Sequence, residues 1–203
     1  MAGAQSSPTP LALALLDEFR GRRPTPLDAL ALARRRFLKG ERVDVGALAR
    51  ELGIGRATLF RWVGSRELLI GEVLWSLYQP ILEQARAQTR GHGAAYVARV
   101  CRRAMDAILD FEPLRRFIEQ DPEYALRILT SKTSTVQARS IDFVRALIEQ
   151  EATAGHLAPP MKPDDLAFLV VRIAESFLYG DQISGREPDI ACATDAIRIL
   201  LGG

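Results

Sequence analysis

The chain of 203 residues has very few of the side chains that build metal or disulfide sites. It contains two cysteines, Cys101 and Cys192, and two histidines, His92 and His156, all far apart in the sequence. Structural zinc sites and disulfide frameworks usually show such residues at short, regular spacings. The sequence therefore predicts no metal, no other cofactor and no disulfide, and it fits a reducing cytoplasm.

The chain also has no long hydrophobic run. The longest apolar stretches, residues 11–16 and 166–171, fall well short of the roughly 18 apolar residues that a membrane-spanning helix needs. No basic residues precede the first stretch, as they would in a secretory signal. We therefore expect a cytoplasmic protein without a membrane partner.

The motifs of common enzymes are missing as well. The sequence has no G-x-S-x-G motif and no glycine-rich phosphate loop, and neither histidine has a nucleophile at a recognisable spacing. We therefore do not expect an enzyme such as a lactone or ester hydrolase.

The chain does have an uneven distribution of charge. Its net charge is only +2, but residues 1–66 contain 12 lysines and arginines against 6 aspartates and glutamates, whereas residues 67–203 contain 15 against 19. A basic surface attracts the phosphate backbone of nucleic acids. The charge thus favours a nucleic-acid contact near the N-terminus, although Arg34, Arg35 and Arg36 are equally well explained as the solvated face of a helix.

The same basic region contains a pattern typical of a helix-turn-helix, VGALARELGIGRATLFRW at residues 45–62. Small and apolar residues recur where two short helices joined by a tight turn must touch: Leu48, Ala49, Leu52, Ile54, Leu59 and Trp62. Gly53 stands at the turn, where the backbone needs a positive φ. The second helix of such a unit enters the major groove of DNA. The pattern predicts DNA binding; a helical corner in which alanine and glycine serve packing alone is the alternative.

The outer side of the second helix carries the candidate DNA contacts, Arg56, Thr58, Phe60 and Arg61. Arg56 is the best candidate for reading a guanine, because arginine can pair with that base through two hydrogen bonds. Asp44 and Ser65 precede the first helix of the unit and the next long helix, and we predict both to be N-caps.

Proline and glycine divide the remaining chain into segments with helical periodicity, and no strand pattern is found. Besides the helix-turn-helix pair, the predicted helices cover residues 11–20, 27–39, 65–91, 96–111, 113–120, 122–130, 136–154, 163–179 and 189–200. The predicted fold class is all-α, with an N-terminal three-helix helix-turn-helix domain and a helical C-terminal domain.

The last two predicted helices are apolar on more than one side. In residues 163–179, Phe168 and Val171 lie off the stripe that the other apolar residues form. A surface helix of a monomer normally has one such stripe. The pattern favours contact with a second subunit; enclosure within the chain's own domain is the alternative.

The motif and the order of helices resemble the TetR family of bacterial transcriptional regulators. The similarity is strongest at residues 44–70, DVGALARELGIGRATLFRWVGSRELLI, whereas the rest of the chain matches only in its order of helices. Within the family, RATLFRWVGSRELL and VVRIAESFLYGD are similar to the QsdR group, regulators connected with the breakdown of lactone quorum signals.

The resemblance implies a homodimer whose two heads enter successive major grooves of a double-stranded DNA operator. It also implies dimer contacts from the last two long helices and a cavity for a small-molecule effector that shifts the heads. The expected domains are an N-terminal extension at 1–24, a helix-turn-helix DNA-binding domain at 25–70, and a helical effector-binding and dimerisation domain at 71–203.

The family motif also implies roles for single positions. The predicted DNA contacts become Arg56, Thr58, Phe60, Arg61, Trp62 and Arg66. Phe60 stands where the family often has a phosphate-contacting tyrosine, Trp62 where it often has histidine, and Arg66 where a lysine binds phosphate. Phe60 has no hydroxyl, and Gly46 replaces a frequently charged residue, so Arg56, Arg61 and the basic first helix are expected to contribute more.

The predicted effector site rests on aromatic and flexible residues spread over the body: Trp75, Met105, Phe111, Phe117, Tyr124, Phe143, Phe168 and Tyr179. A cavity lined by them suits an apolar, acyl-chain-like molecule, although each is also explained as plain core. Arg172 and Glu175 join the candidates because they interrupt the most apolar helix, and buried charges require partners. Three explanations of Arg172 and Glu175 remain open: they pair with each other, they contact the second subunit, or they bind the polar head of an effector.

The sequence therefore predicts a dimeric DNA-binding transcriptional regulator, a repressor released by a small apolar effector such as an acylated lactone. A DNA-binding regulator that needs no effector is the alternative.

Overall fold

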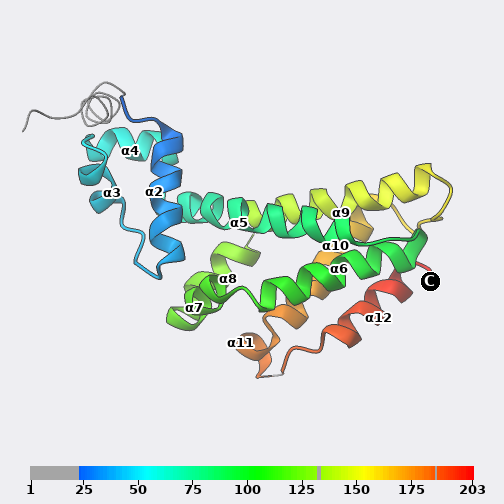
Figure 1. The fold of residues 1–203 in the computed structure, drawn as a ribbon. Coiled ribbons are helices and arrows are strands. Elements are labelled where there is room, and N and C mark those ends of the chain that lie inside the picture. Colours follow the sequence, from blue (N-terminus) through cyan, green and yellow to red (C-terminus); the bar gives the residue numbers. More distant parts are fainter. Residues whose placement is uncertain (1–22, 132–133, 186) are drawn as a thin grey trace, which may run out of the picture.

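The computed structural model describes residues 23–131, 134–185 and 187–203, and within these ranges the chain forms only helices and connecting loops (Figure 1). The prediction of an all-α fold is confirmed. The helix predicted at 11–20, and all but the end of the predicted extension at 1–24, lie outside the described residues. No helix of the described part is long and apolar enough to cross a membrane.

The helices form a small head and an elongated body. The head contains α2 (Pro26–Leu38), α3 (Val45–Glu51) and α4 (Arg56–Val63), and α5 (Arg66–Gln88) leads from it into the body. The body continues with α6 (Gly93–Leu109), α7 (Glu112–Gln120), α8 (Pro122–Thr130), α9 (Thr135–Thr153), α10 (Pro163–Leu178), α11 (Gly180–Ser184) and α12 (Ile190–Leu200). The predicted helices within the described ranges agree with these to within a few residues at either end; α11, a single short turn of helix, was not predicted.

The head folds as the sequence pattern predicts. Leu48 and Leu59 are fully buried and Ala49 nearly so, where α3 packs against α4. Gly53, between the two helices, has a φ of 65°, the left-handed conformation that favours glycine. The predicted N-caps are confirmed, because the Asp44 carboxylate accepts a hydrogen bond from the Ala47 N–H and the Ser65 hydroxyl accepts one from the Leu68 N–H.

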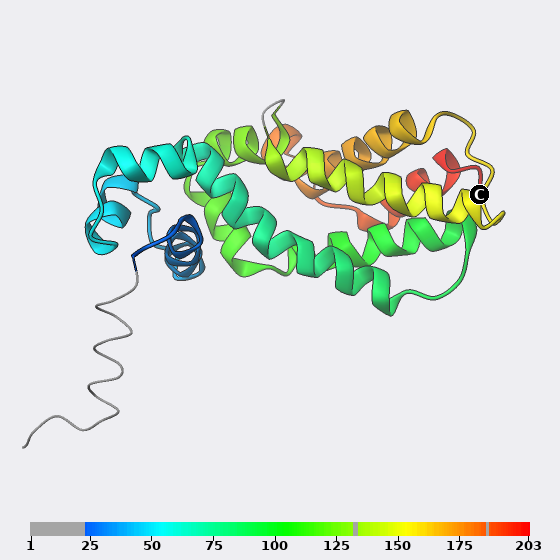
Figure 2. The ribbon, with the colours of Figure 1, turned by 90° about the horizontal axis from the view of Figure 1, so that it is seen from above.

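The body is a layered bundle around α5, α6 and α9. Helix α5 packs against both α6 and α9, α10 packs on α9, and α12 packs on α6 and α10. Seen from above, the long body helices run roughly along the molecule, with the head at one end (Figure 2). Because α5 contacts α2 as well as the body, it connects the two parts as one continuous helix.

Side chains from α7 and α8 fix the head against the body. The ring of Phe37 in α2 lies 5.4 Å from that of Phe117, which lies 6.2 Å from that of Tyr124. The Arg66 guanidinium stacks over the Tyr124 ring at 4.8 Å and donates from Nε to the Val43 carbonyl at 2.9 Å. The orientation of the head therefore depends on the position of α7 and α8.

Enlarging the alanine at the crossing of α3 and α4 should destabilise the head. We expect Ala49→Leu to lower the free energy of unfolding by about 1–3 kcal/mol, because an overpacked crossing forces the helices apart. Urea unfolding followed by tryptophan fluorescence measures this, since Trp62 packs on the same core. Ala57→Leu, on the exposed side of α4, is the matched control; equal stability of the two variants would contradict the predicted close crossing.

Candidate nucleic-acid interface and internal cavity

Helix α4 presents its arginines to solvent. Arg56 and Arg61 are exposed, whereas Leu59 is fully buried and Trp62 half-buried against the head core. Thr58 and Phe60 are partly buried. An outward face with two arginines on the second helix of a helix-turn-helix has the chemistry needed to contact phosphates and base edges.

The electrostatics around α3 show further positive charge on this surface. The hydrogen bond from the Ala47 N–H holds the pKa of Asp44 below its usual value, and the nearby Arg50, Arg56 and Arg42 lower it further. The N-cap of helix α4 is Gly55, which has no side chain to accept hydrogen bonds from the first N–H groups of the helix. A helix N-terminus without a capping side chain can accept an anionic group such as a phosphate.

Arg66, the first residue of α5, is partly buried at the junction between head and body. Its guanidinium stacks on the Tyr124 ring, and its Nε donates a hydrogen bond to the Val43 carbonyl. The phosphate contact that the sequence motif assigns to Arg66 stays a prediction.

A second candidate site is a cavity of about 70 Å³ inside the body, enclosed by helices α5, α6, α8, α9 and α10. Four of the predicted effector residues line it: Met105, Phe143, Glu175 and Tyr179. Most of the other lining side chains are aliphatic, so the cavity is largely apolar. A pocket of this composition suits a mostly hydrophobic molecule.

The remaining predicted effector residues lie elsewhere. Trp75 packs under the Arg139 guanidinium, which also forms an ion pair with Glu72. Phe117 and Tyr124 belong to the junction between head and body, and Phe111 is the N-cap of α7. Phe168 is exposed, and Arg172 extends from α10 with 45% of its side chain exposed. Of the predicted aromatic residues, some therefore line the cavity, some lie at the junction between head and body, and some lie at the surface.

The cavity lining includes a polar cluster around Glu175. Gln137 Nε2 lies 3.1 Å from both carboxylate oxygens of Glu175, and Arg172 pairs with the same carboxylate at 2.6 Å. The hydroxyls of Tyr78 and Tyr179 share a hydrogen bond of 2.9 Å. Arg172 and Glu175 thus pair with each other, as the sequence allowed, and Glu175 also faces the cavity.

Burial governs the protonation of these groups. It raises the pKa of Glu175, although the hydrogen bond from Gln137 and the charge of Arg172 act in the opposite direction. Burial also raises the pKa of both tyrosines and raises that of the Cys101 thiol to about 12. The tyrosines and the thiol are therefore neutral near neutral pH and line the cavity without charge.

Sequence reasoning missed Tyr78, Gln137 and Cys101 as cavity residues. Tyr78 follows the buried stripe of α5, so its spacing looks like ordinary core. Gln137 lies beside a polar stretch of sequence, and only the packing of α9 on α10 brings it to Glu175. No local signal in the sequence connects these positions.

An apolar surface lies on α10 and α12. Phe168, Leu169 and Ile199 are 48%, 37% and 66% exposed. Helices α10 and α12 pack on each other, and exposed apolar side chains on them favour a protein contact at this part of the body.

Comparisons with known proteins agree with this geometry. A family model described as "Tetracyclin repressor-like, C-terminal domain" matches residues 92–202. Among solved structures, the chain is similar to the R. erythropolis transcriptional repressor QsdR from the TetR family, with a TM-score of 0.82 and 30% identity over 88% of this chain and 96% of that chain. The TetR family transcriptional regulator PfmR from Thermus thermophilus aligns at 20% identity over 89% of this chain and 97% of that chain, with a TM-score of 0.36. The comparison with curated proteins gives no significant match.

The buried carboxyl of Glu175 should make stability depend on pH. Because its pKa is raised by folding, the wild-type chain should lose stability relative to Glu175→Gln as the pH rises above about 4.3, the ordinary pKa of an unfolded glutamate. Chemical unfolding of both chains between about pH 4 and pH 7 measures the difference. Glu83→Gln, on the exposed side of α5, is the control; a wild-type chain that gains stability relative to Glu175→Gln as the pH rises would contradict the assignment.

Proposed function

Because the chain belongs to the TetR family of transcriptional regulators, we propose that it is a homodimeric repressor that leaves its DNA operator when a small apolar effector enters the body. The observation that carries the proposal is that one chain has both an arginine-bearing outward face on α4 and an apolar cavity lined in part by Glu175. We place the protein near QsdR, whose structure is described as that of a transcriptional repressor.

On the DNA side, Arg56 is the proposed base-reading residue. It stands at the start of α4, and its guanidinium lies 5.5 Å from the centre of the Phe60 ring. The Phe60 ring, which lacks the hydroxyl that would bind a phosphate, would then help to orient Arg56. Arg61 and the uncapped N-terminus of α4 supply phosphate contacts that fix the helix in the groove.

On the effector side, the lining favours a molecule with an apolar chain and a small polar head, such as an acylated lactone. The hydrogen bond between Tyr78 and Tyr179 uses only one of their two hydroxyl protons, so the other can be donated to an ester or amide oxygen. One water molecule needs about 10–15 Å³ of cavity volume. A cavity of about 70 Å³ therefore has room for a few water molecules but not for an acyl chain. Effector entry therefore requires the lining helices to move apart.

That movement reaches the head through α5. Tyr78 and Leu82 of α5 line the cavity, and the same helix begins at Arg66 in the junction with α7 and α8. Expansion of the cavity would displace α5 and thereby the head. In the proposed dimer, in which the exposed apolar residues of α10 and α12 form the interface, such a displacement changes the spacing of the two heads.

Removing the guanidinium of Arg56 should weaken sequence-specific binding. Against a duplex selected from a random pool by the wild-type chain, we expect Arg56→Ala to lose about 1–3 kcal/mol of discrimination at one base pair. Gel-shift titrations with the selected duplex and its single-base variants measure this.

The control is Arg103→Ala, which makes the same charge change on the exposed face of α6. Wild-type binding should weaken steeply as salt rises, because counterions are released on phosphate contact. Binding that ignores both sequence and salt would refute the repressor proposal.

Filling the cavity should block the effector response and leave DNA binding intact. We expect Ala104→Leu, which projects into the cavity from α6, to stay on the operator in the presence of octanoyl homoserine lactone, whereas the wild-type chain dissociates. Ala107→Leu, on the exposed side of the same helix, should dissociate as the wild type does. Gel shifts across a lactone titration read out both; a wild-type complex unaffected by a panel of acylated lactones would favour a regulator that needs no such effector.

A further inference from the structure

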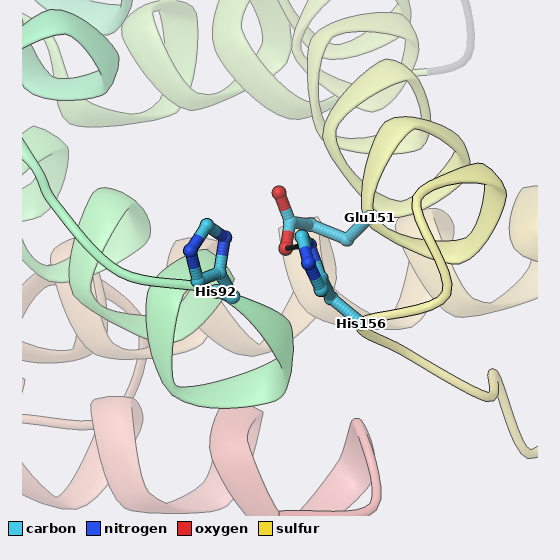
Figure 3. A group of neighbouring side chains, drawn as sticks. All are labelled: His92, Glu151 and His156. Atoms are coloured by element: carbon cyan, nitrogen blue, oxygen red, sulfur yellow. Dashed lines mark ion pairs between the residues drawn. The ribbon is translucent and has the colours of Figure 1, made fainter.

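Three side chains from distant parts of the sequence meet at the far end of the body from α4. One ligand atom each from His92, Glu151 and His156 lies within 4.8 Å of the other two. Figure 3 shows the two imidazoles near each other, with the Glu151 carboxylate beside His156. The centres of the two imidazole rings are 4.1 Å apart. Both histidines are exposed, whereas Glu151 is buried.

Local structure holds these residues in place. His92 is the N-cap of α6, Glu151 lies in the last turn of α9, and His156 follows the turn that ends α9 at Gly155. Gly93 has a φ of 68°, and a Cβ there would lie 2.7 Å from the His156 carbonyl oxygen. The loop after α9 therefore packs so closely on the start of α6 that only glycine fits between the two histidine-bearing segments.

The carboxylate of Glu151 has an incomplete set of partners. One oxygen accepts a hydrogen bond of 2.8 Å from the Gly93 N–H, and the same oxygen lies 3.5 Å from His156 Nδ1, which is long for a hydrogen bond. In the described part of the chain, Glu151 has no arginine or lysine partner. This buried carboxylate therefore lacks the permanent counter-charge that an arginine or lysine would give, and a bound cation would supply one.

We propose that His92, Glu151 and His156 bind a divalent transition-metal ion of the zinc class. Two imidazole nitrogens and one carboxylate oxygen form a ligand set that zinc uses with a fourth position left to water, and the nitrogens disfavour magnesium and calcium. Zinc bonds of about 2.0–2.2 Å require ligand atoms roughly 3.3 Å apart in a tetrahedron. The exposed imidazoles can reach that spacing by rotating their side chains, while Glu151 stays hydrogen-bonded to Gly93.

The metal would join the start of α6 to the end of α9. Both helices line the internal cavity, and α12 packs on α6. Because the site lies at the opposite end of the body from the head (Figure 1), its occupation acts on the stability of the body and requires neither DNA nor effector. Metal binding at this site can therefore be tested independently of the proposed function.

Cobalt(II) tests the proposal directly, because its visible spectrum reports nitrogen and oxygen coordination. Tag-free protein titrated with Co²⁺ should develop one absorbing site per chain, Zn²⁺ should displace the cobalt, and an excess of Mg²⁺ should not. His92→Asn and His156→Asn should each weaken cobalt affinity by more than about tenfold, and Zn²⁺ should raise the melting temperature of the wild type more than that of either variant.

Two further variants separate binding from folding. Glu151→Gln keeps an oxygen for the Gly93 N–H but is a poor metal ligand, so it should fold and lose cobalt binding. Cys192→Ser removes the exposed thiol, a competing soft ligand, and should bind as the wild type does. No saturable cobalt or zinc binding, or binding that survives both histidine substitutions, would overturn the proposal and leave Glu151 as a cap for α6 only.

Discussion

The burial of α5 is the constraint on which the rest of the structure depends. Its first turns, with Leu69, Ile70 and Val73 buried, lie where the head meets the body, and its later turns bring Tyr78 and Leu82 to the wall of the cavity. Helix α5 runs without a break from Arg66 to Gln88, with Pro80 between the two cavity residues. In the proposed mechanism this helix transmits a displacement from the cavity to the head, and the contact of Arg66 with Tyr124 adds a second connection at the junction.

The two buried glutamates of the body, Glu151 and Glu175, show two ways of accommodating a carboxylate. Glu175 has an arginine and an amide as partners in the lining of an apolar cavity, so its charge is balanced mainly within the chain. Glu151 has a backbone N–H and an exposed histidine, and its charge is balanced only in part. The cost of burying an unpaired carboxylate is large, which makes these two positions the most informative polar residues of the body. One belongs to the proposed effector site and the other to the proposed metal site.

The local pattern of the sequence was enough for the helices and the head. Gly53, the N-caps Asp44 and Ser65, and the buried Leu59 follow from contacts within a few residues, where helical periodicity and capping chemistry decide the outcome. The cavity was predicted only in part, because an apolar stripe shows that a residue is buried but not which neighbour it meets. The sequence suggested Phe117 and Tyr124 as cavity residues, but both pack at the junction that supports the head. Tyr78 and Gln137 showed no such signal, but both line the cavity.

The sequence by itself determined the all-α class, the helix-turn-helix with Arg56 and Arg61 on its outer side, and the family resemblance, since all of these depend on short-range spacing. Only the tertiary structure decided that Arg66 stacks in the junction, that Glu175 meets Gln137 in the lining of a cavity, and that His92, Glu151 and His156 come together. The physical reason is that these contacts form when helices far apart in the chain pack side by side, and periodicity along one helix carries no information about the side chains of its neighbour.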